Sequence, residues 1–336
     1  MSPRPTRFIP RFTTAIIACV ALALSGCAAT DAELGAAEAS ATTWSFTDDV
    51  GKTVTLDQRP TKIAGLSDVL FSMVNYGLQP VASFGYSSLK DDPRFKDLDT
   101  TGIVELGAVY GEINLEGLAA AAPDVIVTHA YPTDASGKID STQPFYGFKD
   151  LAQQEQAEKI APIITIAMAG SASDVITRTT ELAVALGVSP DSGPVKDGKA
   201  AFEAASTALT QAAANGVRTQ VMYAEAANVY VAKAADDPSL RLYQSLGMTF
   251  VTPKTKDYYW DIIGWEDYDT VGGDLVLYSE RGFGPDQLKK QPTFAATAAA
   301  KADQVHPWVF AGMDYVSQAA YLEQLAGFVG SSKKLG

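Results

Sequence analysis

The side chains that usually carry out reactions or hold bare metal ions are scarce in this sequence. Its two histidines are His129 and His306, and its two cysteines, Cys19 and Cys27, lie near the N-terminus. Bare transition-metal sites are commonly built from clustered imidazole and thiolate ligands. The sequence also lacks G-x-S-x-G and G-x-G-x-x-G, the motifs of a hydrolase nucleophile and of dinucleotide binding. We therefore predict a protein that is not an enzyme, needs no cofactor and binds any metal already wrapped in a ligand.

Aromatic and polar side chains that could grip such a ligand follow several predicted strands. Ligands of open parallel sheets bind beyond the C-terminal ends of the strands. Aromatic rings and phenol groups suit a bulky chelate because they supply apolar area and hydrogen bonds. Core packing is the alternative for any single aromatic, but the run Tyr258-Tyr259-Trp260 cannot all point inward. The candidate ligand-binding residues are Tyr86, Tyr110, Tyr131, Tyr259, Trp260, Arg281 and Trp308.

Strand and helix patterns that would position these residues alternate along the chain. After a hairpin over 44–56, the predicted strands are 62–65, 80–84, 124–127, 162–166, 220–223, 248–251 and 274–278. The predicted helices are 68–76, 115–121, 173–186, 194–214, 240–246 and 316–329. Such alternation predicts βα units on a mainly parallel sheet, repeated in two similar halves. One large α/β domain is the alternative.

The N-terminus carries the features of an export signal. Three arginines precede an apolar run from Thr13 to Leu24 that is too short to span a bilayer. Leu24-Ser25-Gly26-Cys27 looks like a bacterial lipobox, in which cleavage leaves a lipidated Cys27 as the first residue. We predict a signal peptide over 1–26, a flexible tether over 27–43, and a lipid anchor on the extracytoplasmic face of the cell membrane. A plain secretory signal is the alternative.

The charge and length of the chain limit its partners. It has 336 residues, with 26 basic and 39 acidic side chains. Loss of the predicted signal leaves 23 basic and 39 acidic side chains, a net charge of −16. Phosphate backbones would repel so acidic a protein, so we predict no nucleic-acid partner. About 290 residues remain after the tether, enough for two domains, and the lack of coiled-coil heptads favours a monomer.

One stretch of the sequence matches a family pattern. Gly111-Glu112-Ile113-Asn114-Leu115-Glu116 leads through alanines into Pro123-Asp124-Val125-Ile126-Val127. With the opening hairpin and the segment from Tyr259 to Leu277, this pattern resembles the ABC-importer solute-binding proteins that handle iron-siderophores, haem and vitamin B12. The resemblance begins at about Trp44. It implies an α/β protein of two lobes, each with a central, mainly parallel sheet flanked by helices, and a ligand cleft between the lobes.

The resemblance also implies domain limits and a membrane partner. The N-terminal lobe would span 44–170, a rigid interdomain helix 171–190 and the C-terminal lobe 191–332. In this family, an acidic residue on each lobe docks onto arginines of the importer's permease, which works with an ATPase. Glu116 and Glu266 match these positions. Carboxylates at helix N-termini are favoured by the helix dipole and stay free to pair across an interface; an ordinary helix-starting acid is the alternative for each.

The resemblance further indicates the type of ligand. Tyr131 matches a family position where a tyrosine contacts the siderophore, and Trp260 lies in a segment where a tryptophan does so. Where hydroxamate binders of the family can have an arginine, this sequence has Tyr110, which leaves Arg281 as the candidate cation of the cleft. A surface ion pair with Glu280 or Asp286 is the alternative role of this arginine.

The small number of cleft cations bears on the charge of the ligand. With at most one arginine, a strongly anionic tris-catecholate complex would lack counter-charges. We therefore predict a neutral or cationic ferric hydroxamate of the ferrioxamine type. A haem protein using His129 as iron ligand and a corrinoid binder are alternatives within the same fold, although a lone histidine at a strand end is more often structural. A surface-anchored enzyme acting on the chelate and an adhesive or sensory lipoprotein are alternatives of other classes.

Overall fold

The computed structural model describes residues 43–335. The predicted signal peptide, the lipobox with Cys27 and all but the last residue of the tether lie outside the described residues. The described residues form one compact unit. Over residues 43–335, no helix combines the length and the apolar character needed to cross a membrane.

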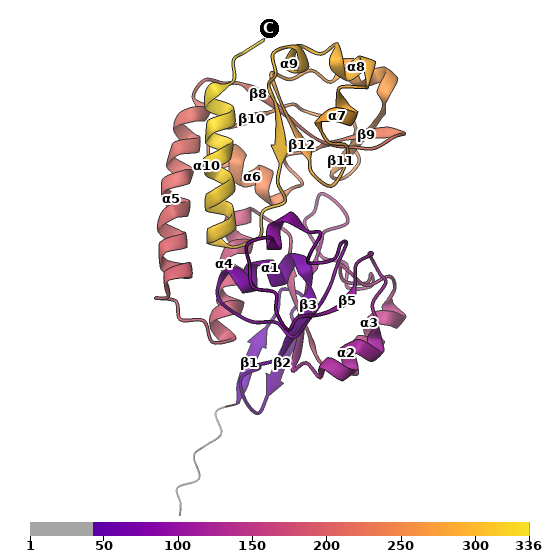
Figure 1. Cartoon of the computed structure of the whole chain (residues 1–336), viewed down its shortest axis with the longest axis vertical. Helices are drawn as coiled ribbons and strands as arrows, with labels where there is room; N and C mark the ends of the chain where they lie inside the picture. The colour runs from indigo at the N-terminus through magenta and orange to yellow at the C-terminus, as the bar shows by residue number, and fades with distance from the viewer. Residues whose placement is uncertain (1–42, 336) are drawn as a thin grey trace, which may run out of the picture. The chain divides into compact units, whose positions relative to one another are not determined.

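The first part of the unit, here called the N-lobe, is built on a parallel sheet (Figure 1). Within the described residues this sheet has the order β5-β4-β3-β6-β7. Its strands are β3 (Ile63–Leu66), β4 (Ala82–Phe84), β5 (Val104–Gly107), β6 (Val125–Ala130) and β7 (Ile163–Ala167). Its helices are α1 (Ser67–Asn75), η1 (Pro93–Phe95), α2 (Leu115–Ala121) and α3 (Leu151–Glu158). An antiparallel hairpin of β1 (Trp44–Thr47) and β2 (Thr53–Leu56) joins β7 through backbone hydrogen bonding of Asp49 to Thr165.

The second part, here called the C-lobe, is built on a mixed sheet. In the described chain its order is β11-β9-β8-β12-β13, with β10 also paired to β8. Its strands are β8 (Arg218–Ala224), β9 (Asn228–Ala232), β10 (Thr249–Phe250), β11 (Trp260–Gly264), β12 (Leu275–Ser279) and β13 (Val305–Trp308). β9 and β11 are antiparallel to their neighbours, and the other pairs are parallel. The helices are α6 (Pro238–Ser245), η2 (Trp265–Thr270), α7 (Pro285–Leu288), α8 (Pro292–Ala295) and α9 (Ala298–Lys301).

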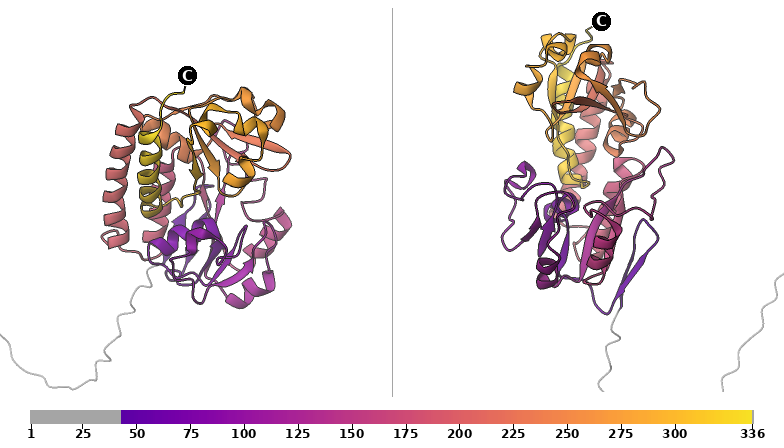
Figure 2. Two further views of the ribbon diagram at one scale, coloured as in Figure 1. Left: turned by 45° about the horizontal axis from the view of Figure 1, so that its top comes forward. Right: turned by 90° about the vertical axis from the view of Figure 1, so that its right-hand side faces the viewer.

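Two consecutive helices lead from one lobe to the other. α4 (Ala172–Ala185) packs against β7 and α1 of the N-lobe and against α6 of the C-lobe. The longer α5 (Gly193–Ala213) then runs beside α10 (Tyr315–Ser331), as Figures 1 and 2 show. α10 also contacts α1. The predicted fold class, two mainly parallel sheets flanked by helices, is confirmed.

The sequence explains why these elements form where they do. All six residues of β6 are buried, which accounts for the unbroken apolar run Val125-Ile126-Val127 in place of an alternating pattern. Gly65 lets β3 approach β6, since a Cβ there would lie 2.3 Å from the carbonyl oxygen of Val127. α4 begins with a capping box formed by Ser171 and Asp174. These local features hold the strand ends, and therefore the loops after them, in fixed places.

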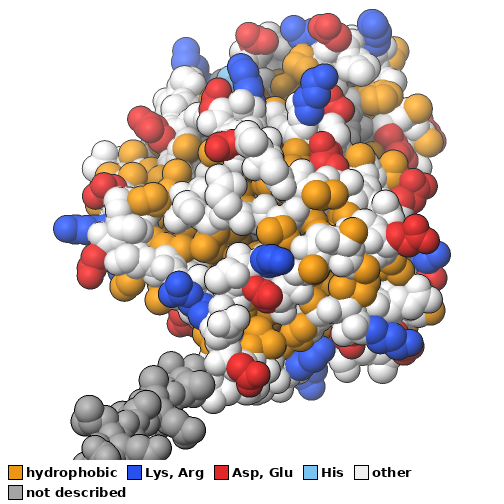
Figure 3. Space-filling view, turned by 60° about the horizontal axis from the view of Figure 1, so that its bottom comes forward, with side chains coloured by type: hydrophobic (Ala, Val, Ile, Leu, Met, Phe, Trp, Pro, Cys, Tyr) orange, Lys and Arg blue, Asp and Glu red, His pale blue; other side chains and the backbone are white. Residues whose placement is uncertain are grey.

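The surface shows how the acidic excess is distributed. On the face in Figure 3, acidic and basic side chains are interspersed among hydrophobic ones, and neither sign of charge occupies the whole face. Exposed large hydrophobic residues among those described include Val109, Tyr110 and Ile262. Scattered exposed apolar residues are normal for a folded protein.

Candidate functional site

A cavity of about 740 Å³ lies at the C-terminal ends of strands from both lobes. Loops after β4 and β6 supply one wall, and loops after β12 and β13 supply the other. This is the place where open parallel sheets bind ligands. Of the predicted ligand-binding residues, six lie in its lining: Tyr86, Tyr131, Tyr259, Trp260, Arg281 and Trp308. Their contact with a ligand stays a prediction.

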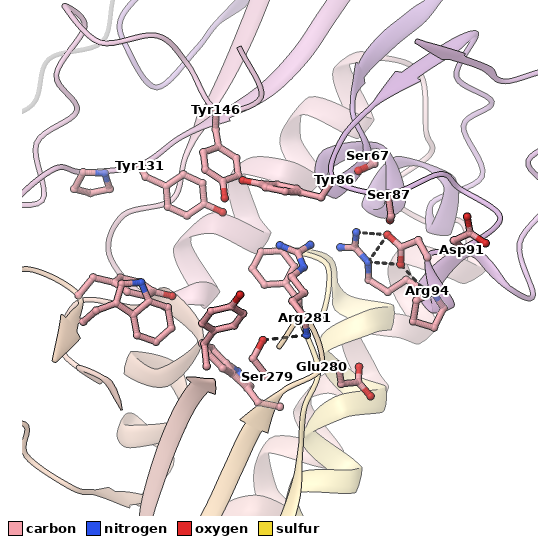
Figure 4. Close-up of a pocket in the computed structure, with 18 of the residues that line it drawn as sticks. Ser67, Tyr86, Ser87, Asp91, Arg94, Tyr131, Tyr146, Ser279, Glu280 and Arg281 are labelled. Atoms are coloured by element: carbon pink, nitrogen blue, oxygen red, sulfur yellow. Dashed lines mark hydrogen bonds and ion pairs between the residues drawn. The ribbon is translucent and has the colours of Figure 1, made fainter. Parts of the chain in front are cut away.

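A cluster of tyrosines forms the N-lobe wall (Figure 4). The ring of Tyr146 lies 4.5 Å from that of Tyr131 and 5.6 Å from that of Tyr86, measured between ring centroids. Tyr110 is 42% exposed and stacks on Tyr86 at 5.3 Å, so it supports the wall from outside the lining. Tyr146 was missing from the sequence prediction. It is placed by its backbone N–H, which donates to the carbonyl oxygen of His129 on β6.

Consecutive aromatic residues form much of the C-lobe wall. Tyr258, Tyr259 and Trp260 all line the cavity and are all partly exposed, in agreement with the expectation that they cannot all point inward. Tyr259 has a φ of +66°, a conformation that non-glycine residues rarely adopt. This turn directs its ring against Trp260, at a centroid distance of 4.6 Å. Trp308 at the end of β13 is only 8% exposed but still borders the cavity.

The cations of the cavity differ from the sequence prediction. Arg281 was expected to be the one candidate cation, with Glu280 or Asp286 as its alternative partner. In the structure its Nη2 lies 2.8 Å from Oδ1 of Asp68 in α1, and Arg94 lines the cavity as well. The expectation of at most one cation is therefore wrong. Periodicity could not reveal these contacts, because Arg281 and Asp68 are 213 residues apart.

Carboxylates compensate both arginines. Nη2 of Arg94 lies 2.7 Å from Oδ1 of Asp68, and Nε of Arg94 donates to Asp92 at 2.9 Å. Burial alone would raise the pKa of the Asp68 carboxyl, but the charges of Arg281 and Arg94 outweigh it and lower that pKa below its usual value. The same carboxylates raise the pKa of Arg94 against the effect of burial. Asp68 and Arg94 are therefore both charged at neutral pH.

His129 lies beneath the cavity and outside its lining. It is 2% exposed, its ring meets Tyr131 edge-on at 6.2 Å, and its Nδ1 has no hydrogen-bond partner among the described residues. Burial lowers the pKa of His129 to about 4. The imidazole is neutral at physiological pH and does not line the cavity. Within the described residues, no group of acidic, histidine or cysteine side chains is arranged to hold a bare metal ion.

The two predicted docking glutamates lie on separate lobes. Glu116 is exposed in the first turn of α2, where Asn114 caps the helix by accepting a 3.0 Å hydrogen bond from the N–H of Gly117. Glu266 is exposed in the first turn of η2. Both carboxylates are free to meet a partner. Their docking role stays a prediction.

Two further residues carry weak signals that the sequence reading missed. Asp68 lies in the first turn of α1 directly before the buried apolar residues Val69 and Leu70, an unusual place for a carboxylate without a partner. Arg94 follows Asp92-Pro93, which starts a short 3₁₀ turn. A buried acid at a helix start could have suggested a basic partner, but nothing local says which one.

The periplasmic binding protein family matches residues 79–308, and no curated protein gives a significant match. The chain is similar to the structure of DesE, a ferric-siderophore receptor protein from Streptomyces coelicolor, with 28% identity, a TM-score of 0.78, and coverage of 87% of this chain and 100% of that one.

Two more solved structures share the fold at lower identity. One is FeuA from Bacillus subtilis, a triscatecholate siderophore binding protein complexed with ferri-bacillibactin, with 17% identity and a TM-score of 0.63 over 85% of this chain and 98% of that chain. The other is the petrobactin-binding protein YclQ from Bacillus subtilis, with 14% identity and a TM-score of 0.64 over 85% of this chain and 98% of that chain. At these identities the likeness concerns the fold alone.

Proposed function

The chain belongs to the periplasmic binding protein family, and from this premise we propose that it captures a ferric siderophore and delivers it to an ABC importer. The family binds solutes and does not catalyse reactions, so the protein is a binding protein and not an enzyme. The single observation that carries the proposal is the cavity of about 740 Å³ with aromatic walls from both lobes. A cavity of this size fits a bulky small molecule, and its phenol groups can donate hydrogen bonds to chelate oxygens.

The charges of the lining support a ferric hydroxamate. Arg94 and Arg281 contribute positive charge, whereas Asp91, Asp92 and Glu280 contribute negative charge in the same lining. Burial and the nearby charge of Asp92 raise the pKa of Glu280. The described lining has no excess of positive charge to balance a strongly anionic complex. A neutral or cationic chelate of the ferrioxamine type needs no such balance.

A haem ligated by His129, one of the alternatives, is less well served by the site. Haem would need an axial ligand, and the buried His129 does not line the cavity. A corrinoid has comparable bulk to a siderophore and is therefore included as an outcome of the test below.

A lipid anchor and a membrane permease complete the proposed function. Cleavage at the lipobox would leave Cys27 as the anchor on the extracytoplasmic face, with a short tether before the first described strand. The permease and its ATPase would receive the ligand through contacts with Glu116 and Glu266. We expect Cys27→Ser to release the protein from the membrane fraction without changing its affinity for ligand, which immunoblotting of fractions would detect. Retention of that variant in the membrane fraction would remove the anchor assignment.

A fluorescence titration tests the function directly. The sequence has four tryptophans, of which Trp260 and Trp308 line the cavity, while Trp44 donates to the carbonyl of Ala185 away from it. We expect saturable quenching by ferrioxamine, reduced in Trp260→Phe and unchanged in Trp44→Phe. The titration panel includes a ferric catecholate, haem, cobalamin and the iron-free chelators. Tighter binding of the catecholate would remove the hydroxamate assignment, and failure of every iron chelate would remove the siderophore proposal.

A further inference from the structure

One oxygen atom of Asp68 is shared between cations of the two lobes. Its Oδ1 lies 2.7 Å from Nη2 of Arg94 and 2.8 Å from Nη2 of Arg281. Asp68 lies in the first turn of α1 in the N-lobe, and Arg281 follows β12 of the C-lobe. The side chain of Asp68 is completely buried, so water does not screen these contacts as it would on a surface. One buried carboxylate therefore holds a guanidinium from each lobe.

Both arginines keep donors that Asp68 does not use. The side chain of Arg94 is only 9% exposed, and its buried Nη1 has no hydrogen-bond partner among the described residues. The side chain of Arg281 is 36% exposed and lies over the ring of Phe310, with its Cζ 4.2 Å from the centroid. Figure 4 shows the guanidinium groups of Arg94 and Arg281 pointing toward one another inside the cavity. Of the two arginines, Arg281 is the one whose exposed side chain a ligand in the cavity can contact directly.

The shared carboxylate also sets the charge of this arginine pair. Two guanidinium groups at one carboxylate oxygen would repel each other strongly without it. Asp92 accepts from Nε and Nη2 of Arg94, so with Asp68 the four groups are electrically balanced. Removing the charge of Asp68 would leave two arginines against the single carboxylate of Asp92, so this cluster would gain a net positive charge.

That balance matters because ferric siderophores differ in charge. Three hydroxamates lose one proton each and neutralise Fe(III), whereas three catecholates lose two protons each and leave a strongly anionic complex. An added positive charge in a poorly hydrated cavity favours the anionic complex and disfavours a cationic one.

We propose that Asp68 is the residue that determines the charge preference of the cavity, by positioning Arg94 and Arg281 and cancelling one of their charges. The inference rests on the proposed siderophore function and adds a specificity determinant to it. Asp68 acts through the arginines and does not itself line the cavity.

The test compares two affinities in each variant. The purified protein is titrated with ferrioxamine and with a ferric tris-catecholate. We expect Asp68→Asn to shift the ratio of the affinities toward the catecholate by at least about tenfold. A purely structural defect would weaken both ligands together, so the ratio separates the two explanations. Asp97→Asn, an exposed carboxylate outside the cavity lining, changes the net charge equally and should leave the ratio unchanged.

If Asp68→Asn alone fails to fold, a second pair of variants repeats the comparison. Asp68→Asn leaves Arg94 without one of its carboxylates, so the comparison can be repeated between Arg94→Gln and the double variant Arg94→Gln with Asp68→Asn. The same shift toward the catecholate is expected in that background.

The possible outcomes distinguish a failure of the role of Asp68 from a failure of the proposed siderophore function. An unchanged ratio in both comparisons, with ferrioxamine still bound by the unmodified protein, overturns the role of Asp68 and leaves the siderophore function standing. An equal shift in Asp97→Asn also overturns it, since net charge alone would then explain the preference. Failure of the unmodified protein to bind either chelate overturns the proposed function and this inference with it.

Discussion

The phenol of Tyr259 donates a 2.7 Å hydrogen bond to Oδ2 of Asp237 in the wall of the cavity. The other oxygen of Asp237 accepts from the backbone N–H of Leu240 and caps α6. Burial raises the pKa of Asp237, and burial together with that carboxyl raises the pKa of Tyr259. A buried carboxyl therefore fixes an aromatic ring of the binding site to the start of a helix.

Removing this phenol should destabilise the protein. Tyr259→Phe leaves a buried carboxyl oxygen without its side-chain donor, which costs about 1–3 kcal/mol in the free energy of unfolding. Urea denaturation would measure the loss. Tyr230→Phe is the matched control, because its phenol donates to Glu225 at 2.8 Å in a solvent-accessible place, where water replaces the lost bond. An equal loss in both variants would contradict the assigned effect of burial.

The stability of the protein should fall in acid through His129. Its pKa in the folded protein is lowered from 6.5 to about 4 by burial, so the unfolded chain takes up the proton first as the pH falls. The stabilising contribution is present above pH 6.5 and is lost between about pH 6.5 and 4, by an amount on the order of 3 kcal/mol.

His129→Gln removes this titration. As the pH falls from about 6.5 to 4, the unfolding free energy of the native protein should decrease relative to that of the variant. A difference that stays constant with pH would show that His129 is not the titrating group.

Glycine is required beside the tyrosine cluster. Gly147 follows Tyr146 with a φ of +97°, and a Cβ there would lie 2.8 Å from Cε2 of Phe84. Gly147→Ala should therefore lower the free energy of unfolding by about 2–4 kcal/mol, from backbone strain and overlap together, and weaken ligand binding by displacing Tyr146. Gly137 has a φ of +72° but open space around its Cα, so Gly137→Ala should cost only about 1 kcal/mol. Thermal unfolding and titration of both variants would show whether the overlap matters.

Charge reversal should separate docking from binding. Replacing Glu116 and Glu266 together by arginine is expected to abolish uptake of labelled ferric chelate while the affinity in solution stays the same, because like charges would then face the permease arginines. Glu203 on α5 and Glu323 on α10 are exposed carboxylates on helices that pack together, and their reversal should leave uptake intact. Normal uptake by the Glu116 and Glu266 variant would show that the importer docks elsewhere.

The sequence by itself determined most of the elements and the class of the site. The predicted helix over 115–121 coincides with α2, and the predictions over 173–186 and 194–214 differ from α4 and α5 by one residue at each end. Caps, glycine stops and apolar periodicity are local signals, so one chain is enough to read them. The strands β5, β9, β11 and β13 and the helix α3 were missed. Partly exposed elements of mixed character give no clear period.

Only the tertiary structure decided how the site is charged. From the sequence, Arg281 could be either a cation of the cleft or part of a surface ion pair with Glu280 or Asp286. Only the fold brings it to Asp68 across the cleft. Arg94 and Tyr146 lie in loops without periodicity, and their roles follow from where the turns place them. Ion pairs and aromatic stacking depend on the approach of segments far apart in the chain, which no local pattern records. The aromatic character of the cavity was therefore predictable, whereas its balance of charge was not.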